Sequence, residues 1–204
     1  MLNQVFAYQT RHLNDLCPPA DSLLKSFNTI MRNMKEVHLG EMGDSAALVH
    51  LSWNSSTFKR IDDCKFRVVA MIDGEKQRNR GVFVSIRRLN LRKNSNSEDC
   101  IDYIRFKFGD TKSPKYCGQL NASVEDMRKI YFGEGGGIIE VTLKLDRFVP
   151  LKNIDNTLDV ELVFTANEDC GHDNLLRCYD DTCISKSLEH DGINNCPPPY
   201  CMDE

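Results

Sequence analysis

The cysteines are the residues of this sequence whose chemistry can be stated most directly, because each can form a disulfide or bind a metal ion. The sequence has nine cysteines, and five of them fall in its last 35 residues. They are Cys17, Cys64, Cys100, Cys117, Cys170, Cys178, Cys183, Cys196 and Cys201. Such density in a short terminal segment is typical of a disulfide framework, which persists in an oxidising compartment. The alternative is zinc, but this segment has neither a CxxC pair nor an HxxxH pattern. We therefore expect disulfides and an extracellular location, in a secreted protein or the ectodomain of a membrane protein.

Acidic residues gather in the same terminal segment. Residues 168–204 contain nine acidic and two basic residues, a net charge of −7, whereas residues 1–167 have a net charge of +3. An acidic segment disfavours nucleic acid and favours a hard cation such as calcium, although a merely solvated tail would have the same composition. The candidate cofactor is therefore calcium, and we expect no nucleic-acid partner.

The stretch "CGHDNLLRCYDDTCISKSLEHDGINNC", residues 170–196, resembles most of an LDL-receptor class A module. The resemblance implies the disulfides Cys170–Cys183 and Cys178–Cys196. It also implies a calcium site whose ligands would be Asp191, Asn195, Asp203 and Glu204. His190 stands where the family has its fourth cysteine, and the neutral Asn195 replaces an acid, so we expect weakened calcium binding. Four plausible pairs use the other eight cysteines and leave Cys201 without a partner. We therefore expect a pairing cysteine shortly after Glu204 in the full protein.

These residues must be positioned by the elements around them, and the middle of the chain alternates between apolar and polar residues. Apolar residues take alternate positions in five segments: Phe66, Val68, Ala70 and Ile72; Val82, Val84 and Ile86; Ile104, Phe106 and Phe108; Ile139, Val141, Leu143 and Leu145; and Val160, Leu162 and Phe164. Strict alternation predicts strands with one buried face and one solvated face. Turn signals between the segments, such as Asp73-Gly74, predict a mainly β protein built as an antiparallel sandwich or barrel.

The block from Cys100 to Gly118 has a cysteine, Asp-Tyr-Ile, alternating apolar residues and then Tyr-Cys-Gly, and it resembles the centre of a CUB domain. Cys64, which opens the strand "CKFRVV", and the closing strand "VELVFTA" fit the same pattern. The resemblance covers residues 60–168. It implies a jelly-roll sandwich with the disulfides Cys17–Cys64 and Cys100–Cys117. The gap between Cys17 and Cys64 is longer than the family's usual one.

Many CUB domains bind calcium through a glutamate and two aspartates, and the resemblance implies Asp102 and Asp146 as the two aspartates. At the expected place of the glutamate this sequence has Arg92. A cation there would repel the ion and would remove a ligand oxygen. Without calcium, Asp102 is expected to be an exposed acid at a strand end.

The N-terminal part has a different period. Between Leu23 and Met34 the apolar residues recur at spacings of three and four, which predicts a helix over 22–37 with Asp21 as its N-cap and Gly40 as its stop. The expected organisation is an N-terminal extension over 1–59, which carries Cys17, a CUB-like sandwich over 60–168, and a partial class A module over 169–204.

Other motifs carry weaker signals. Asn54 and Asn121 lie in glycosylation sequons. The stretch "GDSAA" at 43–47 is similar to the surroundings of a serine-protease nucleophile, but it lacks the glycine after the serine, and we predict no enzyme. A basic run is interpreted as a solvated strand end or, alternatively, as a patch for an acidic partner or a glycosaminoglycan. Its members are Arg87, Arg88, Arg92 and Lys93.

The two resemblances imply a non-catalytic fragment that recognises an extracellular or cell-surface protein, as part of a receptor or co-receptor ectodomain. The alternative is the accessory region of a larger secreted or membrane-anchored protease. No apolar run is long enough to span a bilayer, so we expect no membrane insertion by this chain. The first residues lack the apolar stretch of a secretory signal, and we expect either that the signal has been left out of this sequence or that the gene model is incomplete.

Overall fold

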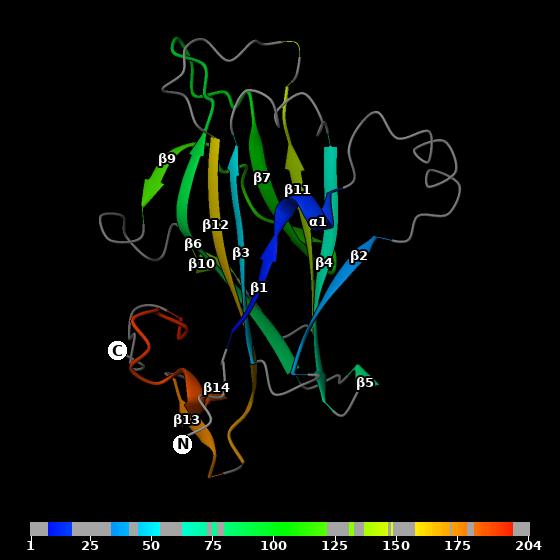
Figure 1. The fold of residues 1–204 in the computed structure, drawn as a ribbon, viewed down its shortest axis with the longest axis vertical. Helices are drawn as coiled ribbons and strands as arrows, with labels where there is room; N and C mark the ends of the chain where they lie inside the picture. The colour runs from blue at the N-terminus through cyan, green and yellow to red at the C-terminus, as the bar shows by residue number, and fades with distance from the viewer. Residues whose placement is uncertain are drawn as a thin grey trace.

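The structure is a computed structural model, and its strands pack as two sheets (Figure 1). It describes residues 8–17, 34–40, 45–53, 63–72, 75–76, 80–121, 131–132, 137–146, 148, 158–171, 173–178 and 182–197. Among these residues the strands form one eight-stranded and one six-stranded sheet. A helix of four residues, α1 (Leu13–Leu16), and a 3₁₀ turn, η2 (Lys186–Leu188), complete the described elements.

The eight-stranded sheet, called sheet A below, has the strand order β1-β3-β12-β14-β13, and β6 joins it through β12. Its strands are β1 (Tyr8–His12), β3 (Ala46–Trp53), β6 (Arg80–Leu91), β9 (Gly118–Asn121), β10 (Tyr131–Phe132), β12 (Leu158–Asp169), β13 (Leu175–Arg177) and β14 (Thr182–Ser185). The short strands β9 and β10 both pair with β6. Strand β12 therefore lies between β3 and β6 and is the central strand of this sheet.

The six-stranded sheet, called sheet B below, has the order β2-β4-β11-β7-β8, and β5 pairs with β4. Its strands are β2 (Lys35–Leu39), β4 (Asp63–Ile72), β5 (Glu75–Lys76), β7 (Tyr103–Phe108), β8 (Thr111–Lys112) and β11 (Ile138–Lys144). Phe66, Val68 and Ala70 of β4 and the alternating apolar residues of β7 and β11 are buried. The residues between them are partly or fully exposed, except near the end of β4.

The core lies between the two sheets. Phe66 of sheet B and Phe164 of sheet A are both fully buried, and their ring centroids are 6.3 Å apart in an edge-to-face contact. Such aromatic pairs add to the free energy gained from burying their apolar area. The prediction of a mainly β sandwich with a disulfide-rich region is confirmed.

Two strand pairs depart from the expected antiparallel pattern. Strand β1 pairs with β3 in parallel, and β2 pairs with β4 in parallel. All other pairs between the described strands are antiparallel. The strands β1, β2 and β3, which come from the expected N-terminal extension over 1–59, are therefore part of the two sheets.

The helix predicted over 22–37 was wrong at its C-terminal end. Residues 18–33 lie outside the described residues, but Lys35–Leu39 forms β2, in which Val37 and Leu39 point into the core. Pairing with β4 satisfies the backbone groups of this segment. The described helix is α1, which buries Leu13 and Leu16 and leads directly to Cys17.

The C-terminal segment continues sheet A. Strand β14 pairs with the end of β12 at Glu168 and Asp169, and β13 adds a hairpin to β14. Figure 1 shows this hairpin below the end of β12. A second buried cluster, formed by Ala46, Cys178, Ile184, Leu188 and Cys196, joins the segment to β3. The boundary that was expected at 169 therefore falls within a strand.

Candidate functional site

Four disulfides connect the described elements, and they are the pairs that the two resemblances implied. Cys17 after α1 is bonded to Cys64 of β4, with Cα atoms 5.1 Å apart, so this bond links the N-terminal segment to sheet B. Cys100 and Cys117 flank β7 and β8 with Cα atoms 5.7 Å apart. The C-terminal pairs are Cys170–Cys183 and Cys178–Cys196. Cys201 lies outside the described residues.

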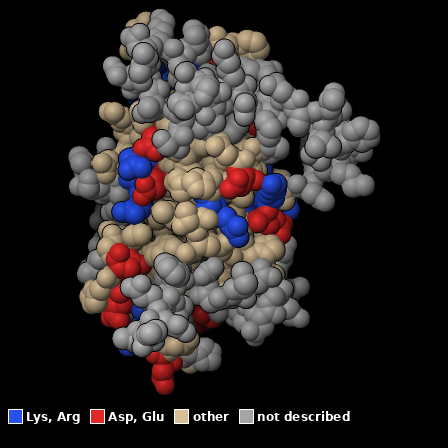
Figure 2. Space-filling model, in the orientation of Figure 1, with Lys and Arg blue, Asp and Glu red and all other residues tan. Residues whose placement is uncertain are grey.

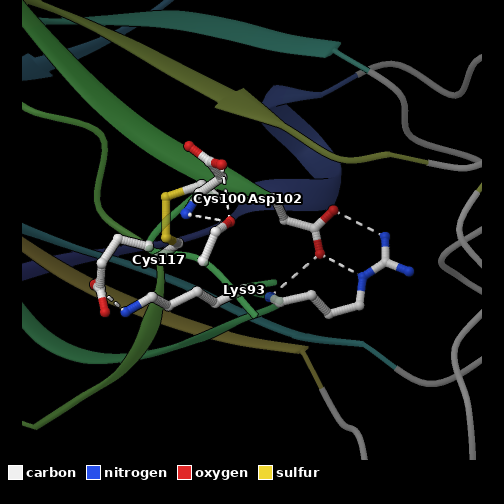
Figure 3. Close-up of a disulfide and its surroundings, with 8 residues drawn as sticks. Lys93, Cys100, Asp102 and Cys117 are labelled. Carbon is white, nitrogen blue, oxygen red and sulfur yellow. Dashed lines mark hydrogen bonds and ion pairs between the residues drawn. A yellow bond between two sulfur atoms is a disulfide. The ribbon is translucent and has the colours of Figure 1, made fainter. Parts of the chain in front are cut away.

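The Cys100–Cys117 bond holds the segment between β6 and β7 against the start of β9 (Figure 3). An isolated bridge pairs Lys93 with Cys100, and another pairs Ile104 with Tyr116. The bond spans 17 residues, and closing a loop of this length stabilises a fold by roughly 3 kcal/mol in the chain-entropy model. The bond therefore fixes the backbone on which Arg92 and Asp102 stand.

Arg92 and Asp102 form a buried, two-pronged ion pair beside this disulfide. Arg92 Nε donates to Asp102 Oδ2 at 2.6 Å, and Arg92 Nη2 donates to Asp102 Oδ1 at 2.8 Å. The Asp102 side chain is 0% exposed and the Arg92 side chain is 11% exposed. Paired N–H donors on one carboxylate make a geometrically specific, charge-assisted contact. The expectation of an exposed Asp102 was therefore wrong, because Arg92 permits its burial.

Asp146 completes this cluster through its backbone. Its N–H donates to Asp102 Oδ1 at 2.8 Å, and its carbonyl oxygen accepts from Arg92 Nη2 at 2.6 Å. The Asp146 side chain turns to its own loop, where Oδ1 accepts from the backbone N–H of Phe148 at 2.9 Å. The cluster thus connects the end of β6, the start of β7 and the end of β11.

The residues expected to bind calcium at this end do not fit a calcium site. The structure brings Asp102 and Asp146 together, but the Arg92 guanidinium lies against the Asp102 carboxylate, where a cation would have to bind. A fixed positive charge repels calcium, and both oxygens of Asp102 already accept hydrogen bonds. No group of three or more His, Cys, Asp or Glu side chains among the described residues could hold a metal ion.

Asn195, one of the expected C-terminal calcium ligands, is engaged in other hydrogen bonds. Asn195 is 1% exposed, and its Oδ1 accepts from the hydroxyls of Tyr8 and Thr165, both at 2.8 Å. Its Nδ2 donates to the carbonyl of Ile193 at 2.7 Å. Two donors occupy both lone pairs of an amide oxygen, so Asn195 has no free oxygen for calcium and instead fixes the C-terminal segment to β1 and β12.

Asp191 is exposed, and its Oδ1 accepts from the backbone N–H of Ile193 at 2.8 Å. His190 before it has a φ of 58°, a left-handed conformation that non-glycine residues adopt infrequently. Asp203 and Glu204 lie outside the described residues. The described part of the expected class A site therefore forms a tight turn without a cluster of ligand oxygens.

The basic run that was expected at a strand end is neutralised by acidic neighbours. Arg87 lies 3.2 Å from Glu161, and Arg88 lies 2.9 Å from Glu161 and also pairs with Asp159. Beyond them, Arg92 binds Asp102 and Lys93 binds Glu98. Figure 2 shows blue and red side chains next to each other over β6 and over β2 and β4. This run therefore offers little free charge to a partner.

Other predicted residues have simpler surroundings. Asn121 is exposed at the end of β9, whereas Asn54 lies outside the described residues.

Tyr116 packs its ring against Phe106, with centroids 5.8 Å apart, and burial raises the pKa of Tyr116 above its usual value of 10.0. No helix among the described residues is long and apolar enough to cross a membrane.

Neither a protein-family model nor a curated protein matches this chain. Similar solved structures include the CUB1-EGF-CUB2 domain of human MASP-1/3, with 11% sequence identity and a TM-score of 0.41 over 65% of this chain and 42% of that chain. The CUB1-EGF-CUB2 domains of rat MASP-1 match with 16% identity and a TM-score of 0.39 over 70% of this chain and 48% of that chain. The MASP-1 CUB2 domain bound to Ca²⁺ matches with 11% identity and a TM-score of 0.39 over 63% and 96%. The chain thus spans less than half the length of the first two structures. Likeness at these identities and TM-scores does not by itself assign the chain to a family.

Proposed function

We propose that this chain is a non-catalytic extracellular recognition module with a CUB-like sandwich, which binds another extracellular or cell-surface protein. The observation that carries the proposal is the placement of the four disulfides within the β-sandwich. They join α1 to sheet B, brace the segments around β7, and tie the C-terminal hairpin to its neighbours. Structural disulfides of this kind are typical of secreted proteins and ectodomains.

The sandwich supplies a rigid scaffold for recognition. Its core residues are close to fully buried in both sheets, and the Arg92–Asp102 pair fixes the ends of β6, β7 and β11 from within. Binding residues are frequent in loops and surfaces that such a scaffold holds in place. The polar cluster at this end is saturated by its own members, so its role is to position backbone.

The resemblance of residues 100–118 to a CUB domain supports the CUB-like part of the proposal. The sequence pattern, the sandwich and the disulfides Cys17–Cys64 and Cys100–Cys117 support it. The class A assignment of the C-terminal segment has less support, because β14 extends sheet A. A role as the accessory region of a protease stays a prediction.

The proposal is tested by directing the full chain through the secretory pathway of cultured cells behind a signal sequence. We expect secreted protein in which peptide mapping finds the four disulfides, and saturable binding of labelled protein to intact cells that trypsin treatment of those cells abolishes. A variant with Cys100→Ser and Cys117→Ser serves as the control for folding. Retention of reduced protein inside the cell, or binding unaffected by trypsin, would contradict the proposal.

A further inference from the structure

The outer face of sheet B carries an excess of basic side chains. In β4, β7 and β11 the residues between the buried apolar positions point away from the core. The register places Lys107 opposite both Glu140 and Lys112, so β8 continues the same face. The cations of this face, called the basic face below, are Lys65, Arg67, Arg105, Lys107, Lys112, Lys115 and Lys144, and its acids are Glu36, Asp63 and Glu140.

Internal ion pairs neutralise only one row of this face. Arg67 lies 2.8 Å from Glu140 and 3.9 Å from Glu36, and Lys107 lies 4.0 Å from Glu140. The remaining cations, which are Lys65, Arg105, Lys112, Lys115 and Lys144, form no ion pair with a described residue. The chain as a whole has a net charge of −4. Positive charge is therefore concentrated here against the overall sign of the protein.

The free cations are spread over adjacent strands in a regular pattern. Lys65 of β4 and Arg105 of β7 both lie opposite Thr142 of the intervening strand β11. Two strand spacings separate their Cα atoms, which amounts to about 10 Å. Lys144 stands two residues further along β11, about 7 Å from Thr142. These distances set a two-dimensional array of charges on a sheet face.

Tyr103 and its neighbours complete the array. Tyr103 lies opposite Lys144, and its ring has Lys115 Nζ at 4.7 Å and Arg105 Cζ at 5.9 Å from the centroid. The Arg105 Nε is buried and has no hydrogen-bond partner among the described residues. Buried donors of this kind normally have a partner. The guanidinium is thus held in place by Tyr103 while part of its hydrogen-bonding capacity is unused.

We propose that the basic face binds a sulfated polysaccharide chain. Sulfate and carboxylate groups recur along such a chain, and they match point charges spaced at about 7–10 Å on a sheet face. An acidic protein segment is a weaker match, because protein partners are recognised mainly by buried aromatic anchors, and the outward side chains here are mostly long cations. The inference rests on the proposed function only in placing the chain outside the cell.

The test uses the full chain and heparin as the probe, with binding followed by surface plasmon resonance at several NaCl concentrations. The variant carries Lys65→Gln and Lys144→Gln, two exposed residues that form no ion pair with a described residue. The matched control carries Arg11→Gln and Lys186→Gln, which remove the same charge from exposed positions on β1 and η2. Unfolding temperatures verify that both proteins fold.

We expect the parent chain to bind heparin with an affinity that falls as salt rises, since binding releases counterions. The Lys65/Lys144 variant is expected to lose at least tenfold in affinity and about two in the slope of log affinity against log salt, whereas the control keeps both values within twofold. Desulfated heparin is the control for the need for sulfate groups, and it should not bind.

Three results would overturn the inference: no heparin binding at low salt, equal losses in the variant and the control, or tighter binding of polyglutamate than of heparin. The last result would assign the face to an acidic protein. The proposed function is tested by other measurements, namely secretion, disulfide formation and trypsin-sensitive cell binding. Failure of this inference is therefore distinguishable from failure of the proposed function.

Discussion

Removing the Arg92 side chain tests the two-pronged ion pair between Arg92 and Asp102. In Arg92→Ala the Asp102 carboxylate, which is 0% exposed, loses two charged donors and keeps the backbone N–H of Asp146 as its best remaining one. Breaking one partner of a buried ion pair costs about 3–5 kcal/mol, because the other charge stays buried without compensation. For a domain of this size each kcal/mol corresponds to about 2–4 °C, so the unfolding temperature should fall by roughly 6–20 °C.

The assay is thermal and urea unfolding followed by circular dichroism with the disulfides intact. Arg92→Lys is expected to recover only part of the loss, because an ammonium lacks the planar fork that matches the carboxylate. Lys93→Ala is the neighbouring control: it removes an ion pair to Glu98, which is 95% exposed, and exposed pairs contribute little. An unfolding temperature of Arg92→Ala close to that of Lys93→Ala would refute the reasoning.

Calcium supplies a second arm of the same experiment. Arg92→Glu introduces the residue type that the CUB resemblance implies at this position. The carboxylates of Glu at position 92 and of Asp102 would then lie where the guanidinium now contacts Asp102. With a dissociation constant of about 1 mM, 10 mM calcium would stabilise this variant by about 1.4 kcal/mol, or roughly 3–6 °C. The same calcium should leave Arg92→Ala unchanged. An equal effect of calcium on both variants would show that Arg92 does not take the place of the ion.

Three further predictions concern the C-terminal segment, the central disulfide and pH. Asn195→Ala should lower the free energy of unfolding by about 1–3 kcal/mol in urea titrations, since the hydroxyl of Tyr8 and a buried threonine lose their acceptor; no change would mean that water replaces the amide. Replacing Cys100 and Cys117 by serine should cost roughly 3 kcal/mol, measured in the same way, and a cost below 1 kcal/mol would contradict the loop-closure estimate. Burial raises the pKa of Tyr116, so the folded state keeps its proton to higher pH than the unfolded state. The corresponding stabilisation is complete below pH 10 and is lost as the pH rises through the raised pKa. Between pH 9 and 11.5 the urea midpoint of unfolding should therefore fall more steeply with pH for the parent than for Tyr116→Phe. Parallel curves for the two proteins would contradict the assignment of this loss to Tyr116.

The sequence predicted the strands well where the alternation was long. Ile104, Phe106 and Phe108 were expected on one face of a strand, and all three are buried in β7. The period of two has a direct physical origin, since successive side chains point to opposite faces. Strand β2 was missed because its five residues contain only two core positions, Val37 and Leu39, after a segment with helical spacing. Its parallel pairing with β4 joins residues distant in the chain, which local patterns do not reveal.

The sequence pointed to residues of the candidate site, but their expected role in calcium binding does not match the contacts that they make. Arg92 was recognised as an obstacle to calcium, but periodicity gives no indication that its guanidinium would reach Asp102. Asn195 was assigned to a metal because it stands at a ligand position of the class A resemblance, whereas one donor that occupies its oxygen, Tyr8, lies 187 residues away in the chain. Hydrogen bonds of that range depend on the folded topology. The basic face had a signal in the sequence, namely the charges of Arg105 and Lys107 between buried residues, but only the strand register places Lys65 and Lys144 beside them.

The two outer faces of the sandwich differ in how their charges are balanced. On sheet A, Arg87 and Arg88 lie against Glu161 and Asp159 on the neighbouring strand, so a partner would have to break existing pairs before it gained new ones. On sheet B, Lys65, Arg105 and Lys144 have no such pairs among the described residues, and an anionic partner would meet charges that are solvated but otherwise unused. Electrostatic attraction then favours sheet B even though the whole chain is acidic, because screening limits each charge to neighbours within about 8–10 Å at physiological salt. Local arrangement of charge, rather than net charge, therefore decides which surface of this molecule can attract a polyanion.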